Sequence, residues 1–99
     1  MQHISTTALE EKLKQEPDTF LIDVREDFEH ELENIGGKLF PLGEILNYVN
    51  EIPKDIPVYI YCRKGIRSQI AIQRLETKFG FTNLINVKGG MEAWKKLDT

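Results

Sequence analysis

The chain contains a single cysteine, Cys62, among 99 residues, and it lacks any long apolar run. One cysteine excludes an internal disulfide and a zinc finger, and leaves three roles: buried filler, reactive thiol, or partner for another chain. No stretch approaches the roughly 20 apolar residues of a membrane span, so we expect no membrane association. The first residues show no basic segment followed by an apolar one, so we expect no targeting signal and a cytoplasmic location, where a lone thiol stays reduced.

Charge and length narrow the class further. Thirteen basic and 16 acidic residues give a formal net charge of −3, which argues against general binding to nucleic acids or anionic membranes. The length suits one hydrophobic core, and no linker, repeat or low-complexity tract divides it. We therefore predict a single domain over residues 1–99, and its small size favours a monomer.

Strand-like and helix-like patterns alternate along the chain. The pattern predicts strands at 20–24, 39–40, 57–62 and 83–87, and helical segments at about 7–17, 45–52, 71–79 and 91–97. Such alternation predicts an α/β fold, with a small, mainly parallel sheet flanked by helices on both faces. Ligands of such sheets bind outside the carboxyl ends of the strands. Cys62 lies at that end of the clearest strand, 57–62.

The segment 62–68 has the layout of an anion cradle. A strand end, a short loop with a glycine and the start of a helix bring backbone amides together, and the helix adds unpaired N–H groups. The same donors would stabilise a thiolate of Cys62. Arg63, Lys64 and Arg67 add positive charge, and residues 56–75 contain no acidic side chain.

A purely structural interpretation of this segment is the alternative. Free cysteine is often buried as a small hydrophobic residue, and basic residues near a helix start could form a solvated surface. Cations at a helix N-terminus are electrostatically unfavourable, however, so their concentration there favours an anionic ligand or a thiolate. We therefore interpret Cys62 as a nucleophile in a basic pocket.

This segment resembles the active-site loop of the single-domain rhodaneses, which are sulfurtransferases. Their pattern C-R-x-G-x-R-[ST] is matched at every position by Cys62-Arg63-Lys64-Gly65-Ile66-Arg67-Ser68. Two flanking segments are also similar to family signatures, 21–26 to an early D-V-R-E and 87–94 to a late G-G-x-x-x-W. The three segments span nearly the whole chain in the family's order.

The resemblance implies a rhodanese-like three-layer fold and a mechanism that needs no metal or organic cofactor. In the family, the cysteine thiolate takes the outer sulfur of a donor such as thiosulfate and becomes a persulfide. Cyanide, a thiol or an acceptor protein then removes this sulfur. Here Cys62 would be the nucleophile and a small sulfur-bearing anion its substrate. The residues that bind the substrate would be Arg63, Lys64, Gly65, Ile66, Arg67 and Ser68.

The match weakens between the first two signatures. Where rhodaneses carry something like G-H-I-x-G-A, this chain has Glu33, Asn34 and Lys38 at the glycine, histidine and alanine positions. These departures leave the nucleophile untouched but could alter the rim of the site and the choice of acceptor.

Several polar residues have open roles. Asp23 either bonds local backbone or supports the loop, and Arg25 is expected in a buried pair with a carboxylate that the sequence does not identify. His3 and His30 have no second ligand at metal spacing, so we expect two surface residues and no metal site. The five carboxylates within 26–33 are interpreted as a solvated helix face, with a docking patch for a partner as the alternative.

Two other functions compete with sulfur transfer by an enzyme. Cysteine-dependent phosphatases have five residues between the loop cysteine and arginine, whereas Cys62 and Arg67 enclose four, a smaller cradle that suits one sulfur better than a phosphate. The second alternative is a non-enzymatic module that carries sulfur to another protein or binds it. The presence of Cys62 leaves the carrier role open.

Overall fold

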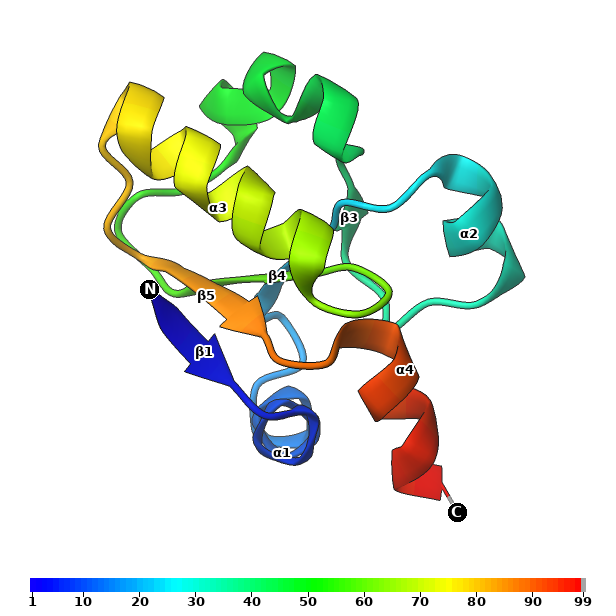
Figure 1. The fold of residues 1–99 in the computed structure, drawn as a ribbon. Coiled ribbons are helices and arrows are strands. Elements are labelled where there is room, and N and C mark those ends of the chain that lie inside the picture. The colour runs from blue at the N-terminus through cyan, green and yellow to red at the C-terminus, as the bar shows by residue number, and fades with distance from the viewer. Residues whose placement is uncertain (99) are drawn as a thin grey trace.

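A parallel sheet forms the centre of the molecule (Figure 1). The computed structural model describes residues 1–98, and within them the strands lie in the order β1-β5-β4-β2-β3. Each neighbouring pair is parallel. The strands are β1 (Gln2–Ile4), β2 (Phe20–Asp23), β3 (Lys38–Leu39), β4 (Val58–Tyr61) and β5 (Leu84–Val87).

Helices cover both faces of this sheet. In Figure 1, α3 and the green 3₁₀ segment η1 lie on one side of the strands, and α1 and α4 lie on the other. None of the helices within residues 1–98 is long and apolar enough to cross a membrane. The helical elements are α1 (Thr6–Gln15), α2 (Asp27–Leu32), η1 (Leu42–Glu51), α3 (Ile66–Phe79), α4 (Gly90–Lys95) and η2 (Lys96–Asp98).

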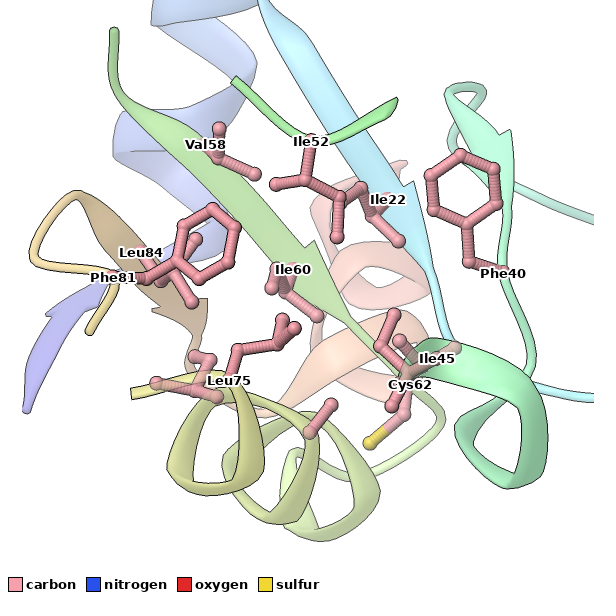
Figure 2. Packing of buried hydrophobic residues seen from close by; sticks show 13 residues of the cluster. Ile22, Phe40, Ile45, Ile52, Val58, Ile60, Cys62, Leu75, Phe81 and Leu84 are labelled. Atoms are coloured by element: carbon pink, nitrogen blue, oxygen red, sulfur yellow. The ribbon is translucent and has the colours of Figure 1, made fainter. Parts of the chain in front are cut away.

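The two faces carry separate hydrophobic clusters, because successive strand residues point to opposite sides. Ile22 and Ile60 face α3, where they pack with Leu75 (Figure 2). Leu21 and Tyr59 face the other side and belong to a second cluster with residues of α1 and α4. The three-layer α/β architecture expected from the sequence is therefore confirmed.

Three local expectations need correction. The strand β1 was not predicted, since Gln2–Ile4 has no apolar run; it forms at the sheet edge by pairing with β5. Helix α1 begins at Thr6, before the expected residue 7. The Ser5 side chain caps the helix by accepting a hydrogen bond from the Ala8 amide. The segment expected as a helix at 45–52 is instead the 3₁₀ segment η1, whose buried anchor is Ile45.

Candidate active site

The loop between β4 and α3 places Cys62 at the carboxyl end of a central strand. Tyr61 ends β4, Cys62 follows it, and α3 begins at Ile66. Gly65 caps this helix with a φ of 98°, a left-handed conformation that favours glycine and lets the chain curl back over the cysteine. Cys62 is only 1% exposed, and its sulfur is turned toward α3 (Figure 2).

Backbone amides converge on this sulfur. The Gly65 amide donates to Cys62 Sγ at 3.1 Å, and the Ser68 amide donates to it at 3.4 Å. The thiol itself donates to the Ser68 hydroxyl oxygen at 3.5 Å. Two N–H donors from the first turn of a helix form the kind of environment that stabilises negative charge on sulfur.

Helix α4 holds the loop from the opposite side. The Met91 amide donates to the Cys62 carbonyl oxygen at 2.8 Å, and the Glu92 amide donates to the Arg63 carbonyl oxygen at 3.0 Å. Gly90 permits this approach, because a Cβ atom there would lie 2.2 Å from the Cys62 carbonyl oxygen. The late glycine pair of the sequence thus has a physical role: it brings the amide end of α4 onto the loop's carbonyls.

Arg67 does not stand free in the basic loop. Its guanidinium donates to both carboxylate oxygens of Glu29, at 2.7 and 3.0 Å. The Arg67 hydrogen bonds outweigh the effect of burial and lower the pKa of Glu29 to about 2. The carboxylate face expected to be solvated therefore needs correction: Glu29 points inward, whereas the apolar Phe28 and Leu32 of the same helix are exposed.

The other two basic side chains of the loop lie in different surroundings. Arg63 forms an exposed ion pair with Glu92, with Nε 3.2 Å from the carboxylate. Lys64 is exposed and has no ion-pair partner among residues 1–98. Carboxylates from α2 and α4 thus compensate much of the charge that the local sequence presents as a basic island.

Asp23 and Arg25 form a buried pair below the loop. The Arg25 side chain donates to both carboxylate oxygens of Asp23, and its amide donates to one of them. Both residues are buried, and the Arg25 guanidinium lies over the ring of Tyr61, 5.5 Å from its centroid. The unidentified carboxylate partner of Arg25 is therefore Asp23, and Asp23 also makes the local backbone bond that was one of its two expected roles.

The remaining expected residues lie in different surroundings, and Glu33 is the one among them that lines the groove described below. His30, expected at the surface, is instead partly buried, with Nδ1 2.9 Å from an Asp23 carboxylate oxygen. Glu33 forms an ion pair with Lys95, and its carbonyl accepts from Arg25. Asn34 donates to the His30 carbonyl, and Lys38 is exposed in β3. Within residues 1–98, no three His, Cys, Asp or Glu side chains are grouped to hold a metal ion.

A groove of about 540 Å³ borders the loop. Its wall includes Arg63 of the loop, Met91 of α4 and the exposed side chains Phe28 and Leu32 of α2. The exposed fractions of Phe28 and Leu32 are 68% and 82%. The groove is large enough for a small anion or for a side chain of another molecule.

Sequence reasoning missed two polar residues of the site. Glu29 was hidden in a run of carboxylates, and nothing in that run distinguishes the inward-pointing one. Asn86 was read only as part of a strand, yet it is 1% exposed and accepts from the Ser68 hydroxyl at 2.5 Å. A polar residue inside the apolar run 84–87 was a signal that could have been used, since buried amides need hydrogen-bond partners.

Comparison with known proteins assigns the chain to a family. The sequence model of the rhodanese-like domain family matches residues 5–97 of this chain. The chain belongs to the rhodanese-like domain family. A crystal structure of a rhodanese-like domain protein from Staphylococcus aureus superimposes with a TM-score of 0.85 at 35% identity, covering 95% of this chain and 91% of that one.

Relatives in Bacillus subtilis carry names of two kinds. The putative sulfurtransferase YtwF is 35% identical over 101 residues, covering 96% of this chain and 91% of the relative. The putative sulfur carrier protein YrkF is 37% identical over 92 residues, 92% of this chain. The chain spans only 49% of YrkF and 59% of another relative from the same organism. Rhodanese-like proteins related to this chain thus include both sulfurtransferases and sulfur carriers by name.

Proposed function

We propose that this protein transfers a sulfane sulfur from thiosulfate or a related donor to a nucleophilic acceptor through a persulfide on Cys62. One observation carries the proposal: the Cys62 sulfur accepts hydrogen bonds from the backbone amides of Gly65 and Ser68 at the start of α3. These donors are in place before any substrate arrives, so they stabilise charge on sulfur without reorganisation. The relatives named as sulfurtransferases support the same reaction class.

The first half-reaction forms the persulfide. The Cys62 thiolate attacks the outer sulfur of thiosulfate, a new S–S bond forms, and the S–S bond of the donor breaks with both electrons leaving on sulfite. The negative charge of the thiolate is then carried by the terminal sulfur of the persulfide. The backbone amides of the loop would stabilise this charge by donating hydrogen bonds to the terminal sulfur.

The second half-reaction returns the thiolate. Cyanide or an acceptor thiolate attacks the terminal sulfur, and the Cys62 sulfur is the leaving group. With cyanide, the product is thiocyanate and no proton needs to move. The covalent intermediate divides one difficult transfer into two steps that use the same loop donors.

The surroundings of the loop favour an anionic donor. Lys64 is exposed, and Arg63 lies at the wall of the groove. Positive side chains near a site raise the local concentration of small anions. Added salt screens this attraction and weakens it. We therefore place the donor's sulfonate near Arg63 and Lys64, and leave Arg67 to hold α2 against the loop through Glu29.

A sulfur-carrier role is the second candidate, because YrkF carries that name. A carrier would accept sulfur on Cys62 in the same way but would pass it to a protein rather than turn over with small molecules. The groove with exposed Phe28 and Leu32 supports this candidate, since apolar side chains beside a nucleophile suit contact with another protein.

Steady-state turnover separates the two. Wild-type protein is mixed with thiosulfate and cyanide, and thiocyanate is measured against time, with Cys62→Ser as the matched control. Many equivalents of thiocyanate per protein, absent in Cys62→Ser, would support the enzyme. A one-sulfur mass gain on Cys62 without release of thiocyanate would support the carrier, and the absence of both a Cys62-dependent sulfur adduct and thiocyanate would contradict sulfur transfer from thiosulfate.

A further inference from the structure

Three side chains link the Cys62 sulfur to the surface at the sheet edge. The thiol donates to the Ser68 hydroxyl oxygen at 3.5 Å, and this hydroxyl donates to Asn86 Oδ1 at 2.5 Å. On the other side of the same amide, Asn86 Nδ2 lies 3.1 Å from Nδ1 of His3. Ser68 and Asn86 are buried, whereas His3 is exposed. The parallel register of β1 and β5 places His3 opposite Asn86.

The direction of these hydrogen bonds suits a neutral thiol. The Ser68 hydroxyl has one proton, which it donates to Asn86 Oδ1, so its oxygen presents a lone pair to Cys62. A lone pair accepts the S–H of a thiol well. The same lone pair repels the negative charge of a thiolate or a persulfide. With this direction, the hydroxyl gives no help to the reactive form of the sulfur.

The opposite direction suits an anion. If the Asn86 amide turns over, Nδ2 donates to the Ser68 oxygen, and the Ser68 hydroxyl is free to donate to sulfur. Asn86 Oδ1 then faces His3 and must accept a proton carried on Nδ1. The two ends of an amide have nearly the same shape, so the turn needs no extra space. The condition is only that the imidazole carries its proton on Nδ1, as the second neutral tautomer or as imidazolium.

We propose that Asn86 is a positioning residue for Cys62, and that the Nδ1 proton of His3 sets its orientation and thereby makes the Ser68 hydroxyl a donor to the sulfur anion. This role rests on the proposed function, since it acts on the thiolate and persulfide of that reaction. Protons balance: the thiol proton leaves to solvent base, Ser68 and Asn86 keep theirs, and the exposed His3 exchanges its ring protons with water.

The other charged residues near the sulfur are not part of this chain of hydrogen bonds. Arg67 interacts electrostatically with Cys62 and is paired with Glu29. Neither residue contacts His3 or Asn86 through a hydrogen bond in the part of the chain that the structure describes. A substitution of His3 therefore tests the amide link without disturbing the Arg67–Glu29 pair.

The first experiment measures the alkylation rate of Cys62 by iodoacetamide against pH. This neutral reagent reports the thiolate and needs no sulfur donor. We expect His3→Phe to lower the rate near neutral pH by about three- to tenfold, the size of one ordinary net hydrogen bond. The control Gln2→Phe, on the neighbouring position of β1, should leave the rate unchanged.

A double-mutant cycle shows whether the effect passes through the amide. In the Asn86→Leu background, His3→Phe should have no further effect on alkylation, because the link is already broken. An effect of His3→Phe that persists in Asn86→Leu would overturn the proposal, as would an unchanged rate in His3→Phe alone.

A spectroscopic measurement on the wild-type chain decides the matter even if Asn86→Leu fails to fold. Long-range ¹H–¹⁵N correlation spectra distinguish the two neutral tautomers of His3. We expect the Nε2–H form with the neutral thiol and a shift to Nδ1–H with the same pH midpoint as alkylation, abolished in Cys62→Ser. An imidazole of His3 that stays in the Nε2–H form while Cys62 ionises would overturn the proposal. If the network responds but no sulfur donor modifies Cys62, only the proposed function fails.

Discussion

The guanidinium of Arg67 donates to both carboxylate oxygens of Glu29, at 2.7 and 3.0 Å, across 38 residues of sequence. The pair joins the first turn of α3 to α2 and neutralises the arginine nearest to the helix start. Positive charge at that position would otherwise oppose the helix dipole. Glu29 therefore lets Arg67 lie close to the sulfur at a smaller electrostatic cost.

Removing the Glu29 charge should strengthen the attraction of the loop for anions. In Glu29→Gln, the charge of Arg67 is no longer compensated, and we expect the KM for thiosulfate to fall about two- to threefold at low ionic strength. Initial rates against thiosulfate concentration measure this. Glu31→Gln, an exposed neighbour in α2, is the control, and an equal KM in the two variants would contradict this view of the loop charge.

The ion pair between Arg67 and Glu29 should make the free energy of unfolding depend on pH in the acid range. Arg67 lowers the pKa of Glu29 from 4.5 to about 2, so the pair stabilises the fold above about pH 4.5. This contribution is lost as the pH falls toward 2. We expect wild type to exceed Glu29→Gln in unfolding free energy by about 1 kcal/mol near neutral pH. Urea denaturation at several pH values should show that the difference vanishes near pH 2; a constant difference would argue against an ionic origin.

Loss of Arg67 itself should weaken the use of an anionic donor. Arg67→Ala removes a positive charge beside the sulfur and leaves Glu29 uncompensated, so we expect the KM for thiosulfate to rise about fivefold or more. Lys14→Ala, an exposed position in α1, serves as the control. Equal effects of the two substitutions would contradict an anion-binding role for the loop.

The contact between α4 and the loop should tolerate no side chain at Gly90. In Gly90→Ala, the new Cβ would lie 2.2 Å from the Cys62 carbonyl oxygen, at a φ of 55°. We expect a loss of about 2 kcal/mol or more in unfolding free energy and a large loss of turnover, because the loop must shift. Gly43→Ala, which has open space around it, should change neither; similar behaviour of both variants in thermal unfolding would refute the contact's importance.

Local sequence patterns were sufficient for the architecture and for the position of the candidate nucleophile. The apolar runs around Ile22 and Ile60 and the helical spacing of Ala71, Ile72 and Leu75 predicted buried strands and a buried helix face, and all of these residues are buried. Cys62 was located by its place at a strand end, which is a local property. The three-residue strand β1 carries no such pattern and exists only through its pairing with β5.

The electrostatics of the site could not be obtained in the same way. The absence of acidic residues over 56–75 suggested an uncompensated basic loop, yet Glu29 and Glu92 approach it from distant segments. Partners of Arg67 and Asn86 depend on which elements meet at the end of the sheet. The spacing of residues in the sequence does not predict such contacts, because they form between distant segments when the layers of the fold pack together.

The mass of the intact protein after exposure to thiosulfate tests the central claim most directly. Wild-type protein, freed of excess donor, should gain the mass of one sulfur atom and lose it again on addition of cyanide. Cys62→Ser should show no gain under the same conditions. No sulfur adduct on the wild-type chain with thiosulfate or any other sulfane donor, or an adduct that survives in Cys62→Ser, would contradict a persulfide on Cys62.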